Sequence, residues 1–443
     1  MSRSSLALPT QRNGRQLARI LDRFLAIEAA SGLVLLMATA AALIWANSPW
    51  SGTYEAFWRT SLSFSVDGIQ ASHPLRFWVN DAVMTIFFLV VGLEIRRELH
   101  DGALADFRVA MLPAVAAAGG VIVPALLYLA VTGSTELRHG WAVPTATDIA
   151  FAVGVLTLLG KRVPPSLRVL LLTLAIVDDI VAIVLIAAVY SEGLTLAGGA
   201  LALCGLLLIV LLQAVGIQRA LVYTIPGALV WVGLLKTGLH PTLAGVILGL
   251  LTPARHDRQG RAEGLLAQAD RALSEMRNRI RAGRPSSRDL LPYVRELKEA
   301  PGQVFSPAEH LEAGLHPWVA YGIMPLFALA NAGVPLGALR TTGADFLSLT
   351  AGIMVALVIG KPVGILLASR IAVGLGLCAL PPGISSRHLL VLGAFAGIGF
   401  TMSLFLANLA FPDSDQLAIT KLAVLLASAL AASVGLILGR RLL

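Results

Sequence analysis

Long apolar segments alternate with short polar connections along almost the whole chain. About twelve of them are long enough for a transmembrane helix, which needs roughly 20 apolar residues. They lie near residues 24–46, 77–95, 110–131, 140–160, 168–190, 194–217, 221–237, 239–252, 315–335, 347–374, 388–411 and 417–440. The pattern therefore predicts an all-α membrane protein with about twelve transmembrane helices.

Composition points the same way. Of the 443 residues, 56% are hydrophobic and 14% charged, and the mean hydropathy of +0.78 is higher than a water-soluble core needs. The segment 24–46 is longer than the apolar region of a signal peptide and lacks an obvious cleavage site, so we expect an uncleaved first helix. The start is rich in Ser and Arg and poor in acidic residues, which leaves a transit peptide as an alternative.

Basic residues gather in every second connection between these segments. Of the 34 Lys and Arg residues, few lie in the odd-numbered connections: Arg59, Arg76, Arg138, Lys236 and Arg340. Positive charge is retained on the cytoplasmic side of a membrane, so we expect both termini to be cytoplasmic. This placement accounts for the net charge of +8 without a nucleic-acid partner.

One polar insertion, residues 253–314, separates the spans of 24–252 from those of 315–440; short cytoplasmic ends, 1–23 and 441–443, complete the layout. Apolar residues recur at helical spacing within 261–283, which predicts a cytoplasmic helix or helical hairpin. The alternative is a solvated, charged linker. Cys204 and Cys378 lie in apolar segments without ligand spacing, so we expect no disulfide, no zinc site and no cofactor.

Asp178 and Asp179 stand side by side in the middle of a long apolar segment. A charged Asp near the centre of a membrane helix costs about 2.5–3.5 kcal/mol on insertion scales, so such a pair is kept where water, cations or protons reach it. Two adjacent like charges also bring proton binding within reach of cellular pH. The doublet indicates an ion pathway. The alternative is a protonated or ion-paired doublet that holds helices together.

Two spans contain helix-breaking residues at membrane depth. In the fourth, Pro144 precedes Thr147 and Asp148; in the eleventh, Gly397 and Gly399 precede Thr401. Interrupted spans at corresponding places in two halves of a transporter indicate its central site. Two structural alternatives remain: the glycines allow close helix packing, and Asp148 serves as a helix N-cap.

Other ionisable residues fall at or within the spans. Lys361 lies near the middle of the tenth span, where we expect an ion pair with an intramembrane Asp; snorkelling to the interface is the alternative. GKP at residues 360–362 lacks the Ser or Thr and the spaced Gly of a phosphate loop, which excludes nucleotide binding there. A second group gathers at the cytoplasmic ends of the second and ninth spans: Glu94, Glu98, Glu312 and His316. This group is either a proton-sensing funnel or a solvated charged surface.

Several long strings together resemble the bacterial Na⁺/H⁺ antiporter family NhaA over roughly residues 25–440. They are VNDAVMTIFFLVVGLEIRREL, WAVPTATDIAFAVGVL, LAIVDDIVAI, KTGLHPTLAGVILG, LEAGLHPWVAYGIMPLFALANAGV, IGKPVGI and GIGFTMSLFLANLAF. NhaA is a standard example of an inverted-repeat transporter. The resemblance implies twelve spans with crossed, broken fourth and eleventh helices, a homodimer in the bacterial inner membrane, and pH-regulated exchange of Na⁺ or Li⁺ for H⁺.

The resemblance also implies roles for single residues. Asp178 and Asp179 match the pair that binds the transported Na⁺, and Lys361 matches a lysine paired with the first of them. Thr147 and Asp148 match the site at the broken fourth helix. Glu94, Glu98, Glu312 and His240 match positions linked to pH response, although His240 alone favours a capping or core role. The sequence departs from the family where Ala313 replaces a common His and where the preceding loop is longer.

The residues themselves suggest a competition mechanism, in which Na⁺ and protons share Asp178 and Asp179 and the oxygens nearby suit a hard cation. Two other functions could use charged residues inside a membrane. An intramembrane aspartyl protease also needs two aspartates, but it brings them face to face, usually from separate helices, to share a proton. A cation channel would pass ions without moving protons, and the titratable doublet together with Lys361 argues against it.

Overall fold

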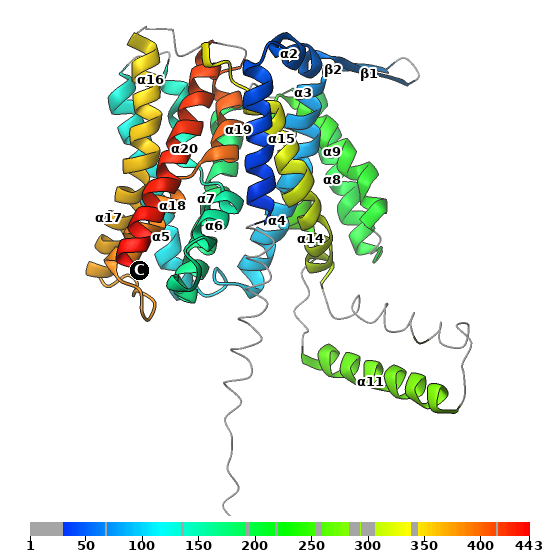
Figure 1. The fold of residues 1–443 in the computed structure, drawn as a ribbon. Coiled ribbons are helices and arrows are strands. Elements are labelled where there is room, and N and C mark those ends of the chain that lie inside the picture. Colours follow the sequence, from blue (N-terminus) through cyan, green and yellow to red (C-terminus); the bar gives the residue numbers. More distant parts are fainter. Residues whose placement is uncertain are drawn as a thin grey trace, which may run out of the picture. The chain divides into compact units, whose positions relative to one another are not determined.

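The computed structural model describes residues 30–66, 69–133, 137–191, 193, 195–217, 220–253, 259–282, 293, 306–337, 344–412 and 415–443. This part is mostly helical (Figure 1). Eight of its helices are long and apolar enough to cross a membrane: Ala30–Asn47, Leu75–His100, Phe107–Thr132 (α5), Pro165–Val189 (α7), Leu196–Ala214 (α8), Pro307–Asn331, Phe346–Gly374 and Asp415–Leu442 (α20). The chain is an integral membrane protein, as the apolar pattern predicts.

Two further spans are each broken into a pair of shorter helices. Leu137–Thr145 and Ile149–Thr157 (α6) meet at a bend of 45°, and Ser386–Ala396 (α18) and Phe400–Ala410 (α19) meet at a bend of 51°. Both breaks fall in the spans where Pro144 and the glycines predict them. The described residues thus contain up to ten spans when each bent pair counts as one.

Among the remaining helices, one is shorter than the expected segment, one begins earlier in the sequence, and one lies in the polar insertion. The segment 221–237 forms Leu221–Thr237, which includes α9 (Thr224–Thr237), whereas 239–252 contains only the nine-residue α10 (Leu243–Leu251). The ninth span begins earlier than expected, because α14 (Pro307–Trp318) leads into α15 (Met324–Asn331). In the polar insertion the expected helix is present as α11 (Gln259–Ala282).

A β-hairpin departs from the all-α expectation. It pairs β1 (Ser61–Val66) with β2 (Ile69–Pro74), and it follows the short helix α2 (Ser51–Arg59). The signal was local: polar and apolar residues alternate from Ser61 to Val66, which is the period of a strand, and the sequence continues with Asp67-Gly68, a common hairpin turn.

The chain divides into two compact units. The first is drawn from Met1–Met84, Asp106–Ser191 and Val319–Leu443, and the second from Thr85–Ala105 and Glu192–Trp318. In the first unit, α2 and the hairpin lie at the end opposite the C-terminus (Figure 1). The boundaries expected at residues 252 and 315 separate the membrane spans from the polar insertion. They are not boundaries between compact units, so the two divisions cannot be compared directly.

Close backbone contacts hold the helices of the first unit. The helix α5 packs against α17 (Lys361–Gly374) through Gly119 and Gly364, where a Cβ on either residue would collide with the carbonyl oxygen of the other. Small residues that let helix backbones approach are a common packing device in membranes. This contact fixes the start of α17, and therefore Lys361, against α5.

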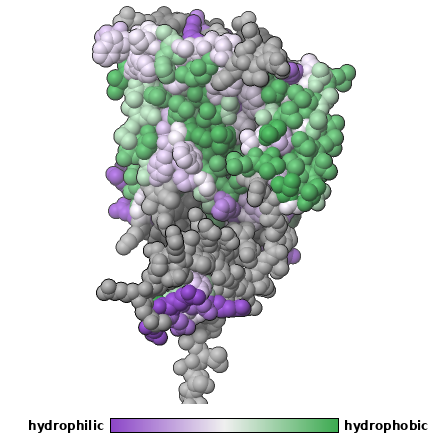
Figure 2. All heavy atoms as spheres, turned by 90° about the vertical axis from the view of Figure 1, so that its right-hand side faces the viewer, coloured by the Kyte–Doolittle hydropathy of each residue, from purple (hydrophilic) through white to green (hydrophobic). Residues whose placement is uncertain are grey.

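The second unit uses the same device and exposes an apolar surface. Gly233 of α9 lies against the backbone of Ala202 on α8. On α8, Leu203, Leu207 and Leu211 are each more than half exposed, and hydrophobic residues cover much of the face that Figure 2 draws. Such a surface is stable in contact with lipid and costly in water.

We expect Gly364→Ala to destabilise the protein, because the added methyl group must push α17 away from α5. Overpacking of this kind costs about 1–3 kcal/mol. Thermal unfolding of the detergent-purified protein measures the effect. Gly374→Ala, at the end of the same helix with open space around it, is the matched control. Equal melting temperatures for the two variants would contradict the packing account.

Candidate functional site

The aspartate doublet lies in the first unit, on α7. The helix α7 begins with Pro165 at its first position, a favourable start, and continues for 25 residues. Asp178 and Asp179 fall near its middle and are 2% and 3% exposed. Two carboxylates at this depth need charged or hydrogen-bonding partners.

Lys361 provides the charged partner. Its Nζ lies 2.8 Å from Asp178 Oδ2, and neither side chain has any exposed surface. The ammonium also donates to the carbonyl oxygen of Thr145, and it interacts electrostatically with Asp179. Lys361 begins α17 directly after a π-helical turn (Ala356–Gly360), a distortion often found at functional sites. The expected ion pair with an intramembrane Asp is therefore present.

Thr147 adds a second donor to the same oxygen. Its Oγ1 lies 2.6 Å from Asp178 Oδ2 and 2.9 Å from the carbonyl oxygen of Ala396. Thr147 stands in the break of the first bent pair, and Ala396 ends α18 at the break of the second. Asp178 Oδ2 thus has two donors, whereas its Oδ1 accepts no hydrogen bond from the described residues. That oxygen can bind a cation or a proton.

Asp148 joins the two broken spans. Its Oδ1 accepts from the backbone N–H of Phe151 at 3.0 Å, which makes it the N-cap of α6. Its Oδ2 accepts from the backbone N–H of Thr401 at 3.1 Å and from the Thr401 hydroxyl. One carboxylate therefore stabilises the N-terminal ends of two half-helices, where the helix dipoles favour negative charge. Asp148 therefore has the N-cap role that the sequence offered as an alternative. It also accepts from the start of a second helix, α19, which the sequence did not indicate.

The glycines of the second break lie in close contacts. A Cβ on Gly397 would collide with the carbonyl oxygen of Leu357, and a Cβ on Gly399 would collide with Ser403 Oγ. Close packing and the break of the helix therefore occur at the same residues. Pro144 lies inside the 3₁₀ helix Leu137–Thr145, just before the first break.

The acidic residues expected to respond to pH lie in the second unit. Arg97 forms an ion pair with Glu312, and its other terminal nitrogen lies 3.9 Å from Glu98 Oε1. Glu312 is buried and also interacts electrostatically with His316. Glu94 is half-buried, as is His240, which lies between α9 and α10.

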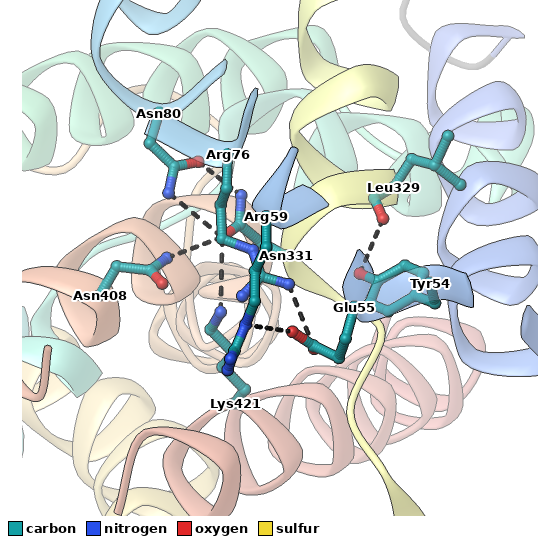
Figure 3. Close-up of polar contacts among 9 residues, drawn as sticks. All are labelled: Tyr54, Glu55, Arg59, Arg76, Asn80, Leu329, Asn331, Asn408 and Lys421. Atoms are coloured by element: carbon teal, nitrogen blue, oxygen red, sulfur yellow. Dashed lines mark hydrogen bonds and ion pairs between the residues drawn. The ribbon is translucent and has the colours of Figure 1, made fainter. Parts of the chain in front are cut away.

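A further buried polar cluster was missed in the sequence. Four residues form it, all in the first unit (Figure 3): Asn80, Asn331, Asn408 and Lys421. Lys421 inside the last span was the available signal, because a charge at that position needs partners. The three asparagines gave no such signal in the sequence, since single amides are common near helix ends.

The chain is similar to known proteins over nearly its whole length. A family model described as Na⁺/H⁺ antiporter 1 matches residues 22–438. A Na⁺/H⁺ antiporter NhaA of Cupriavidus necator is 52% identical over 95% of this chain and 89% of the relative. A second NhaA, from Janthinobacterium sp., is 52% identical over 95% of this chain and 92% of the relative. A Na⁺/H⁺ antiporter NhaA 2 of Sorangium cellulosum is 50% identical over 98% of this chain and 92% of the relative.

We expect Lys361→Ala to lower the melting temperature strongly, because it leaves Asp178 buried without its charged partner. Breaking a buried ion pair from one side costs about 3–5 kcal/mol. The double variant Lys361→Ala/Asp178→Asn should recover part of the loss, since no uncompensated charge remains. Lys236→Ala, at an exposed residue, is the control. If the single and double variants melt alike, Asp178 is not the partner that Lys361 neutralises.

Proposed function

The chain belongs to the NhaA family of Na⁺/H⁺ antiporters, and on this basis we propose that Asp178 and Asp179 bind the cation and the protons that it exchanges. The transported cations are Na⁺ and Li⁺. The single observation that carries the proposal is the asymmetry of Asp178: Oδ2 is held by Lys361 and Thr147, while Oδ1 accepts nothing from the described residues. Hard cations prefer such carboxylate and hydroxyl oxygens.

Exchange follows from competition for these oxygens. When the doublet loses protons, its negative charge attracts Na⁺, and the cation competes with the Lys361 ammonium for Asp178. When a proton binds, the charge falls and the cation leaves. Because both ligands use the same carboxylates, one cannot be carried while the other is bound. Asp148 holds the two broken spans around this point and keeps Thr147 and Ala396 beside Asp178.

Net charge moves if more than one proton enters for each Na⁺ that leaves. Each such charge couples to about 2.3 kcal/mol per 100 mV of membrane potential. The inside-negative potential then drives Na⁺ out of the cell, which serves sodium and pH homeostasis. Regulation by pH would act through the acidic group of the second unit with its histidines, namely Glu94, Glu98, Glu312, His240 and His316.

Topology and assembly complete the proposal. The chain has twelve spans in the bacterial inner membrane, with α9 and α10 as the seventh and eighth, and the broken fourth and eleventh spans cross. Both termini and the insertion 253–314 are cytoplasmic because the basic residues gather in those segments. Alternating access comes from motion of one helical bundle against another around a central site, and the protein forms a homodimer.

The test uses everted membrane vesicles from cells that lack their own antiporters, with a dye that reports the pH gradient. Added Na⁺ or Li⁺ should collapse the gradient with the wild-type protein but not with Asp179→Asn. Asp106→Asn is the matched control, because Asp106 is an exposed N-cap of α5 and Asn caps equally well. A wild-type protein that carries a Na⁺ current without moving protons would instead be a channel.

A further inference from the structure

The Asn331 cluster, defined as Asn80, Asn331, Asn408 and Lys421, lies at the ends of four different helical segments. Asn80 sits in a π-helical turn (Trp78–Val83), Asn331 ends α15, Asn408 lies near the end of α19, and Lys421 lies in the second turn of α20. Asn331 and Lys421 are 1% and 6% exposed. A lysine this deeply buried is costly in lipid, so the cluster calls for an explanation beyond packing.

One amide oxygen receives all three of the other side chains. Asn331 Oδ1 accepts from Asn408 Nδ2 at 3.1 Å, from Asn80 Nδ2 at 3.4 Å and from Lys421 Nζ at 3.4 Å (Figure 3). A carbonyl oxygen has two lone pairs, so three donors exceed its capacity, and the two longer contacts are the weaker ones. The contact of the Lys421 ammonium is therefore one of the two weaker ones at this oxygen, which is of the kind that binds hard cations.

The cluster is linked to the aspartate site by α19. Thr401, at the start of this helix, binds Asp148, and Asn408 follows seven residues later. Seven residues are two helical turns, so both side chains lie on one face about 10 Å apart along the axis. The helix runs from the break towards the end of the first unit that carries α2 and the hairpin (Figure 1).

Polar groups continue from the cluster to the surface. Arg76 lies one helical turn before Asn80, and its Nη2 is 3.3 Å from Glu55 Oε1 of α2 (Figure 3). The side chains of Arg76 and Glu55 are 28% and 45% exposed. The polar groups thus extend from the buried Asn331 to the end of the unit opposite the C-terminus, which is the outer end if the termini are cytoplasmic.

We propose that the Asn331 cluster is the outer gate of the cation pathway, with the Lys421 ammonium as a tethered cation that closes it. A departing Na⁺ displaces the ammonium from Asn331 Oδ1, and the ammonium returns after the ion has passed. Lysine can make this movement because its long stem lets the charge reach the interface. The inference rests on the proposed function, and it adds a second cation-binding site to the pathway beyond the aspartate doublet.

The test compares Na⁺ taken from the two sides of the membrane, in right-side-out and everted vesicles. For Lys421→Met, we expect the half-saturating Na⁺ concentration on the outer side to fall by about fivefold or more, the lower range of a coupling between two sites. The inner-side value should stay near the wild-type one. Lys421→Arg should behave as the wild type, because it keeps the charge, and Lys236→Met controls for the loss of one basic residue at an exposed position.

Asn408→Ala provides an independent test if Lys421→Met fails to fold. It removes the shortest competing donor to Asn331 Oδ1, so the ammonium is held more firmly and the outer half-saturating concentration should rise. Equal shifts on both sides, or wild-type values on the outer side, would overturn the gate while leaving antiport intact. A wild-type protein that moves no protons with Na⁺ from either side would overturn the proposed function, and the gate with it.

Discussion

The buried ion pair between Lys361 and Asp178 is the interaction on which the rest of the first unit depends. Both charges are fully removed from solvent, so each is tolerated only while the other stays within contact distance. This requirement fixes the start of α17 against the middle of α7. It also makes the pair sensitive to a third charge, because a cation that neutralises Asp178 removes the reason for Lys361 to remain there. In the proposed mechanism, structural support and ion exchange thus depend on one contact.

The broken spans make room for that contact without leaving unpaired backbone in lipid. Asp148 accepts from the N-terminal ends of α6 and α19, and its own N–H donates to the carbonyl oxygen of Ile398 at 2.8 Å. Opened backbone at membrane depth is tolerated only when protein or water satisfies it. The carboxylate of Asp148 thus accepts hydrogen bonds at both breaks, which accounts for a third buried aspartate in this unit.

Much of this site could be predicted because its signals are local. Charged residues at membrane depth marked Asp178, Asp179 and Lys361, and Pro144 and the glycines marked both breaks. The bond between Asp148 and Thr401 could not be predicted, since it joins residues 253 positions apart whose proximity depends on how two helices turn. The Asn331 cluster was missed for the same reason: a single amide in the sequence gives no signal, and only tertiary packing brings Asn80, Asn408 and Lys421 to Asn331. The hairpin, by contrast, had a readable period-two pattern.

The central claim is that Na⁺ and protons compete for the same carboxylates, and proton release on Na⁺ binding tests it most directly. The purified protein in weakly buffered detergent solution is titrated with NaCl, with choline chloride as the salt control, while a pH indicator records released protons. The account predicts saturable release by the wild-type protein and none by the Asp178→Asn/Asp179→Asn variant. Saturable Na⁺ binding, measured by calorimetry, with no release of protons would contradict it.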